Sequence, residues 1–162
     1  MDNIPKIEEV LSVKPQIESL EYVDKGGFKA VFKGVIDGKK EAIKLICLPS
    51  DDEDDGKRTE IIARVKREFD TLGHCQTSYL VKLGTLPFEL IKINDINYVI
   101  YSEELIEGNS LRNKIKENFK PEFDELKQLT ICLMESLIEI NKLNLINRDI
   151  KPGNIMATTN PD

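Results

Sequence analysis

The strongest constraint on the fold is a run of three strand-like segments divided by turn sequences. The segments Ile17–Val23, Phe28–Ile36 and Glu41–Leu48 are rich in β-branched and aromatic residues. Lys25-Gly26-Gly27 separates the first from the second. Asp37-Gly38, a strong signal for a tight hairpin, separates the second from the third. The pattern predicts three antiparallel strands.

The elements that follow predict a larger sheet with helices. Apolar residues at helical spacing predict a helix over Arg58–Leu72. Leu80–Ile93 and Ile96–Tyr101 predict two more strands, which complete a five-stranded sheet. A short helix comes next, with Ser110 as a candidate cap. A long amphipathic helix is predicted over about 122–143. One face of that helix carries Leu126, Leu129, Leu133, Leu137 and Ile140.

Two segments fall outside this pattern. Residues 1–15 have apolar residues at helical spacing and fit either a short docking helix or a frayed leader. The run 51–55 is entirely acidic and predicts a solvated linker, to which the sequence assigns no function.

Composition narrows the possible functions. The chain has 162 residues, enough for one core or two very small ones, and a net charge of −6 that argues against a broad nucleic-acid surface. Nucleic acid is therefore not an expected partner. No apolar run approaches membrane-spanning length, so a membrane is not an expected partner either. The cysteines Cys47, Cys75 and Cys132 are odd in number and far apart. Reduced thiols, and with them a cytoplasmic location, are therefore expected.

A loop near the end of the chain has the chemistry that phosphoryl transfer needs. In it stand Asp149, Lys151 and Asn154, between apolar flanks. A carboxylate accepts the proton of the attacking hydroxyl, an ammonium neutralises the moving phosphoryl group, and an amide oxygen helps to hold Mg²⁺. Pro152 and Gly153 keep the loop from continuing as helix. A surface turn of the same composition is the alternative.

Lys44 and Glu68 form a second candidate set. Lys44 is the only charged residue of 42–48, and strand alternation places it on the same face as Ala42. Glu68 borders the apolar stripe of its helix, and burial of an unpaired carboxylate is costly, so Lys44 is its natural partner. The alternatives are a solvent-facing Lys44 and a Glu68 that pairs with Arg64, one helical turn earlier.

Three of these motifs resemble those of protein kinases. The run from Asn147 to Asn154 resembles the catalytic loop His-Arg-Asp-x-x-x-x-Asn, with Asn147 in place of the His. A Lys two residues after the Asp is the form of the Ser/Thr branch. Glu41-Ala42-Ile43-Lys44 resembles the Val-Ala-Ile-Lys strand. In the first turn, only Gly26 and Val31 match the phosphate loop G-x-G-x-x-G-x-V, so an ordinary hairpin remains the alternative there.

The resemblance covers about residues 17–156 and implies an α+β, protein-kinase-like fold. It implies a five-stranded antiparallel N-lobe sheet with one main helix, followed by the first helices and catalytic loop of the C-lobe. The implied organisation is a leader over 1–15, an N-lobe over 16–104, and a hinge with a partial C-lobe over 105–162. Divergent bacterial Ser/Thr kinases are the most similar branch.

The resemblance also implies the ligands, ATP and Mg²⁺, and a role for each site residue. Lys44 would orient the phosphates, held by Glu68, with Asp149 as the base, Lys151 stabilising the γ-phosphoryl group and Asn154 binding the metal. The expected nucleotide contacts are Gly26, Gly27, Val31, Ala42, Lys44 and the backbone groups of Glu104 and Ile106. Glu103 would guard the back of the nucleotide pocket. Asp24 and Lys29 replace the first and third glycines of the phosphate loop.

The chain ends at Asp162, where the family continues with an Asp-Phe-Gly segment and further helices. We therefore expect a truncated domain with very weak activity in isolation. We also expect a missing C-lobe, a partner protein or an oligomer to cover the helix over 122–143. Two alternatives to a Ser/Thr protein kinase stay open. One is a catalytically inactive kinase-like module that binds nucleotide or a protein. The other is a small-molecule kinase, which Lys151 argues against.

Overall fold

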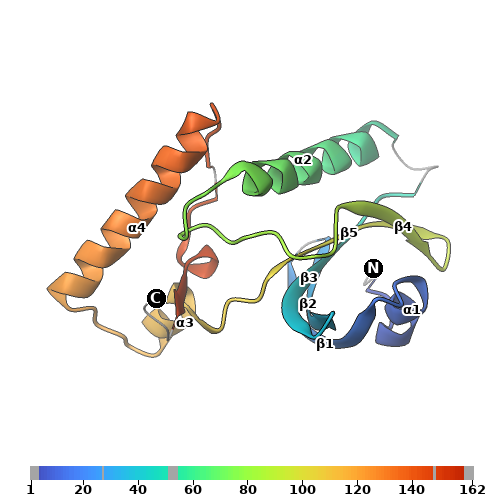
Figure 1. Cartoon of the computed structure of the whole chain (residues 1–162), viewed down its shortest axis with the longest axis horizontal. Helices are drawn as coiled ribbons and strands as arrows, with labels where there is room; N and C mark the ends of the chain where they lie inside the picture. Colours follow the sequence, from blue (N-terminus) through green and yellow to red (C-terminus); the bar gives the residue numbers. More distant parts are fainter. Residues whose placement is uncertain (1–3, 27, 51–54, 148, 159–162) are drawn as a thin grey trace. The chain divides into compact units, whose positions relative to one another are not determined.

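The structure is a computed structural model that describes residues 4–26, 28–50, 55–147 and 149–158 (Figure 1). The chain forms two compact units. The first consists of residues 1–73 and 82–105, and the second of residues 74–81 and 106–162. Residues 51–54 of the predicted acidic linker lie outside the described residues.

The first unit is built on a five-stranded antiparallel sheet with the strand order β1-β2-β3-β5-β4, as predicted in number and direction. The strands are β1 (Ile17–Gly26), β2 (Lys29–Ile36), β3 (Lys39–Cys47), β4 (Glu89–Ile93) and β5 (Ile96–Glu104). β1 runs past Val23 to Gly26. The prediction of a strand from Leu80 was wrong, because β4 begins only at Glu89. Gly84 and Pro87 interrupt the segment before it, and both residues disfavour a continuous strand.

The hairpin between β2 and β3 turns at Asp37 and Gly38, which both have positive φ, of 49° and 72°. Such a pair of residues matches the twist of the flanking strands. The Glu18 carboxylate on β1 accepts a hydrogen bond of 2.9 Å from the Gly38 amide. The turn is thereby attached to the neighbouring strand as well.

Replacing Gly38 by Ala should lower the free energy of unfolding by about 1 kcal/mol. A Cβ on Gly38 would meet no atom within 4 Å, so the cost comes from the left-handed backbone alone. Urea unfolding measures the change. Gly73→Ala is the control, because Gly73 lies in a helix and an added Cβ would meet only the flexible end of Leu83, at 3.3 Å, so its loss should be smaller. An equal loss in both variants would contradict the assignment of the cost to the backbone at Gly38.

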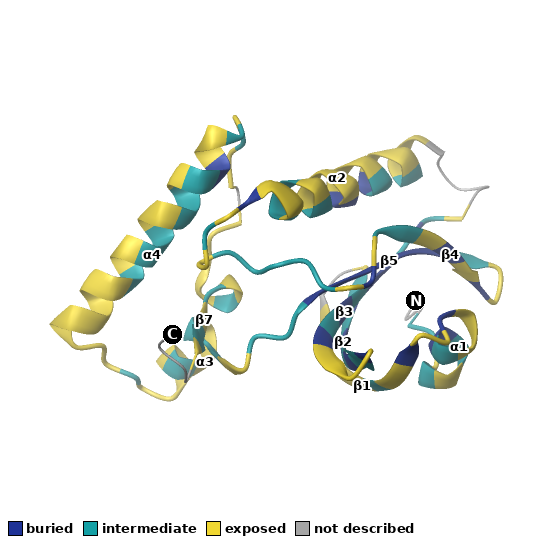
Figure 2. Ribbon diagram, viewed as in Figure 1, coloured by how far each residue is buried: buried dark blue, intermediate teal, exposed yellow. Residues whose placement is uncertain are grey.

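A helix packs on each face of the sheet. On one face, α2 (Asp55–His74) places Ile61, Val65 and Phe69 against side chains of β3 and β5 that include Ile46 and Tyr101. The opposite face carries the larger core of the unit, in which β2, β3 and β5 supply fully buried side chains. Figure 2 shows these buried positions along β3 and β5. Lys44 and Glu103 lie on the face that α2 covers, the face of Ile46 and Tyr101.

The N-terminal helix α1 (Ile7–Val13) packs on the opposite face, so the docking helix is the alternative that the structure shows for residues 7–13. Val10 is only 1% exposed and belongs to the larger core. α1 contacts both β1 and β4. Lys14 at its end forms an ion pair with Glu89 of β4, and the Asn94 amide donates a hydrogen bond of 2.6 Å to Glu9.

The second unit contains two helices and a two-stranded sheet. α3 (Leu111–Lys116) follows β6 (Gly108–Ser110), and α4 (Phe123–Lys142) agrees with the predicted long helix to within a residue at each end. The Ser110 hydroxyl accepts a hydrogen bond of 3.2 Å from Asn113, which confirms the predicted cap. β6 pairs with β7 (Met156–Thr158), and a short 3₁₀ turn, η1 (Pro152–Asn154), lies just before β7.

Most of α4 is exposed (Figure 2). Its apolar residues Phe123, Met134 and Ile138 are 78%, 53% and 52% exposed. In the part of the chain that the structure describes, no helix is both long and apolar enough to cross a membrane.

Candidate active site

Lys44 lies in the middle strand of the sheet, directly opposite Val31 of β2 and Tyr101 of β5. Its ammonium is 5.5 Å from the centroid of the Tyr101 ring, within the range of a cation–π contact. The Lys44 side chain is only 13% exposed. A buried ammonium needs compensating charge, and the structure supplies two carboxylates.

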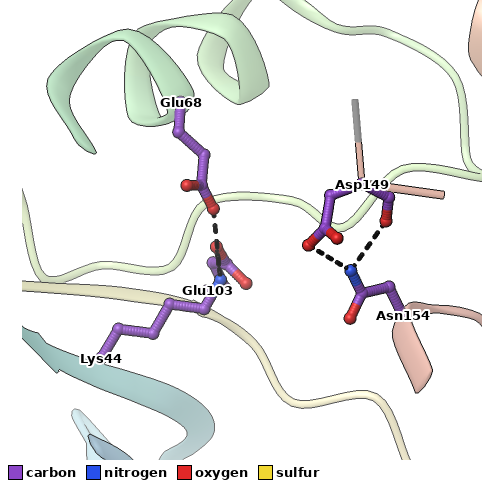
Figure 3. Close-up of polar contacts among 5 residues, drawn as sticks. All are labelled: Lys44, Glu68, Glu103, Asp149 and Asn154. Carbon is purple, nitrogen blue, oxygen red and sulfur yellow. Dashed lines mark hydrogen bonds and ion pairs between the residues drawn. The ribbon is translucent and has the colours of Figure 1, made fainter. Parts of the chain in front are cut away.

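The two carboxylates are those of Glu68 and Glu103 (Figure 3). Glu68 lies 4.0 Å from the Lys44 ammonium and its side chain is 52% exposed. The predicted pair therefore exists, but it is long and half in solvent. Glu103 forms a closer ion pair and hydrogen bond with Lys44, and its side chain is 5% exposed. From its place in the sequence, Glu103 was expected at the back of the nucleotide pocket, and its contact with Lys44 was not predicted.

A second lysine joins the cluster. Lys29 of β2 lies beside Lys44, with Glu68 and Glu103 close enough to act on its charge. Burial disfavours its ammonium form and Lys44 adds like-charge repulsion, so the pKa of Lys29 falls to about 8 from its ordinary 10.5. Burial likewise raises the pKa of Tyr101, with a smaller effect of the two glutamates.

The low pKa of Lys29 predicts a rise in stability above pH 8. Between pH 8 and 10.5 the unfolded chain holds a proton on Lys29 that the native chain has lost. Stability rises with pH wherever the unfolded state binds more protons. The cost of burying the charged Lys29 side chain is thus fully present below pH 8. Between pH 8 and 10.5 its loss raises the free energy of unfolding by up to about 3 kcal/mol.

Urea unfolding at several pH values from 7 to 10.5 tests this expectation. Lys29→Met should be more stable than the wild-type chain at pH 7 and should lack the extra rise. Lys39→Met removes an exposed lysine at the start of β3 and should keep the rise. Parallel curves for the wild-type chain and Lys29→Met would contradict the low pKa.

The predicted phosphate loop is a tight hairpin in its described part. The register of β1 and β2 shifts between Tyr22 and Asp24, after which Asp24 pairs with Val31 and Gly26 with Lys29 up to the turn. Gly27 lies outside the described residues. The Asp24 carboxylate accepts a hydrogen bond of 2.7 Å from the next backbone amide.

The residues predicted to bind the base fall in both units. Ala42 is half-buried and lies opposite Glu103 in the β3–β5 register. The backbone amide of Glu104 donates a hydrogen bond of 2.9 Å to the Lys82 carbonyl. The Glu104 amide, predicted to meet the base, is thus bonded within the first unit. Ile106 begins the second part of the other unit.

In the second unit, the loop residues come together as the sequence predicts (Figure 3). The Lys151 ammonium lies 2.6 Å from Asp149 Oδ1. The Asn154 amide donates hydrogen bonds of 2.8 Å to Asp149 Oδ2 and 2.9 Å to the Asp149 carbonyl. Asn147 accepts a hydrogen bond of 2.8 Å from the Asp149 amide, so the residue that replaces the expected His orients the loop.

Neighbouring elements hold this loop in place. The Leu111 amide donates a hydrogen bond of 2.8 Å to the Ile155 carbonyl, just after η1. A Cβ on Gly153 would lie 3.1 Å from the guanidinium carbon of Arg112, so the α3 side chain packs directly on the turn. The carboxylate of Asp149 is 67% exposed and thus accessible to a reacting group.

Comparisons with known proteins agree with this geometry. The model of the protein kinase domain matches residues 17–162. The chain is 27% identical to a probable serine/threonine-protein kinase of Clostridium acetobutylicum over 151 residues, which cover 92% of the chain and 21% of the relative. It is 26% identical to a probable serine/threonine-protein kinase of Clostridium perfringens over 141 residues, covering 87% and 19%. Calcium-dependent protein kinase 5 of Plasmodium berghei is 27% identical over 162 residues, covering 96% and 26%.

The chain belongs to the protein kinase domain family, and its relatives place it with the Ser/Thr protein kinases. It corresponds to the N-terminal part of that fold, and it spans about a fifth of the length of the two clostridial relatives.

Proposed function

We propose that the chain is the N-terminal part of an ATP-dependent kinase domain that transfers the γ-phosphate of Mg-ATP to a protein Ser or Thr hydroxyl. The observation that carries the proposal is the compact set of Asp149, Lys151 and Asn154 in a family member. In this proposal Asp149 accepts the proton of the hydroxyl, and Lys151 stabilises the transferred group. Lys44 orients the α- and β-phosphates.

The donor set of the loop fits Mg²⁺. Because the Asn154 amide nitrogen faces Asp149, its amide oxygen is left to bind a metal. The described residues contain no group of three or more His, Cys, Asp or Glu that could hold a metal. That fits an ion bound through one or two protein ligands and the phosphates of its nucleotide. When bound, Mg²⁺ neutralises charge on the phosphates.

The second candidate is a catalytically inactive kinase-like module that binds nucleotide or a protein. The observation that favours it is the turn after β1, where Asp24 and Lys29 stand in place of two glycines of the phosphate loop. In this case a protein partner would bind the exposed apolar side chains of α4, since exposed apolar patches mark interaction sites. A cytoplasmic location is part of the proposal, since cysteines that are odd in number and far apart in the sequence are typical of reducing compartments.

A thermal-shift titration with Mg-ATP tests nucleotide binding. A ligand that binds only the native state stabilises it by about 2.7 kcal/mol at a hundred times its Kd, so the melting temperature should rise. Lys44→Ala should remove most of the rise. No rise in the wild-type chain would reject nucleotide binding, and an unchanged rise in Lys44→Ala would reject the role of Lys44.

A further inference from the structure

Lys44 is held by two carboxylates that differ in burial. Glu103 is almost fully buried and forms the close ion pair, whereas Glu68 is half-exposed and 4.0 Å away. Water and salt screen an exposed pair much more than a buried one. The contact with Glu103 is therefore the stronger of the two.

The sheet itself builds this contact. Tyr101 of β5 lies directly opposite Lys44 of β3, and Glu103 is the next residue of β5 on the same face. Diagonal neighbours on two paired strands are within reach of a lysine side chain. The positions of Lys44, Tyr101 and Glu103 thus follow from one hydrogen-bonded register. Glu68 belongs to a helix that packs on the sheet through side chains.

We propose that Glu103 is a positioning residue of the nucleotide site, which holds the Lys44 ammonium on the sheet, while Glu68 adds a weaker second contact. The role of Lys44 in binding phosphates rests on the proposed function, whereas its contact with Glu103 does not. One consequence is that the orientation of Lys44 does not require Glu68. Another is that Lys44 and Glu103 act as a pair, so that replacing either residue leaves the charge of the other buried and uncompensated.

A double-mutant cycle on the whole chain tests the contact without nucleotide. Lys44→Met leaves the buried Glu103 carboxylate without its ammonium, and the melting temperature should fall by about 10 °C. Adding Glu103→Gln should recover at least about half of that loss, because it removes the unpaired charge. Adding Glu68→Gln should recover less than about a quarter. Glu60→Gln, on the exposed side of α2, is the matched control and should recover nothing.

The affinity for Mg-ATP is the second readout. Glu103→Gln should raise the Kd about tenfold, and Glu68→Gln less than about threefold, when binding is followed by calorimetry. A larger effect of Glu68→Gln in both experiments, or additive losses of stability for Lys44→Met and Glu103→Gln, would overturn the proposal. If the wild-type chain bound no nucleotide, the proposed function would fail while the stability cycle still decided the role of Glu103.

Discussion

Asp149→Asn should reduce phosphate transfer by about two to four orders of magnitude, the usual contribution of a positioned base. An Asn has almost the shape of Asp but keeps only one acceptor oxygen, so it can serve only one of the two donors, Lys151 and Asn154, which lie 2.6 Å and 2.8 Å from the two carboxylate oxygens. It cannot take up the proton of an attacking hydroxyl. Incorporation of radiolabelled phosphate, into the chain itself and into a Ser/Thr-containing protein, measures the rate.

The affinity for Mg-ATP should change less than about twofold in the same variant, because the change is aimed at the chemical step. The control is Asp124→Asn in the exposed first turn of α4, which should leave the rate unchanged. If Asp149→Asn kept more than a tenth of the wild-type rate, Asp149 would not be the base. If the full-length protein bound Mg-ATP but transferred no phosphate, the inactive module would be the better description.

Gly84→Ala should lower the free energy of unfolding by about 3 kcal/mol. A Cβ on Gly84 would clash with the Glu41 carboxylate, whose carbon would be 2.8 Å away, and with the Ser102 hydroxyl. Both groups are buried. Glu41 accepts hydrogen bonds of 2.5 Å from Ser102 and of 2.9 and 3.0 Å from the Thr85 amide.

Urea unfolding measures this loss, and a second variant identifies its cause. Glu41→Ala alone should also destabilise the chain, because the buried Ser102 hydroxyl and the Thr85 amide lose their acceptor. Combined with Gly84→Ala it should cost clearly less than the sum of the two, since removing the carboxylate makes room for the new methyl group. Strictly additive losses would show that the added Cβ does not meet the carboxylate.

The parts of the site that the sequence predicted correctly are those that depend on local spacing. Asp149, Lys151 and Asn154 lie within six residues, and a turn containing Pro and Gly brings their side chains together. α4 follows in the same way from its apolar period. The position of Lys44 beside Ala42 required only the alternation of a strand.

The parts that the sequence missed depend on pairings between distant strands. Glu103 meets Lys44 because β3 and β5 pair in one particular register, and residues 59 positions apart then become neighbours. No local pattern specifies that register. The burial of Lys29 has the same origin, since it depends on the strands and the helix around it. The strand predicted from Leu80 was too long, because the apolar residues before β4 pair with β5 only at isolated positions such as Leu83, opposite Glu103.

Helix α1 contacts the two outermost strands of the sheet, β1 and β4, from one face of the sheet. Residues 17–162 match the kinase family model, so α1 lies before the family boundary. An expression fragment cut at that boundary would lose Val10 from the core and the Lys14–Glu89 link across the sheet. The apolar side chains that α1 covers would then be exposed, and exposed apolar surface favours association between molecules. Such a fragment should be prone to aggregation, and fragments intended for crystallisation or assays should begin before residue 7.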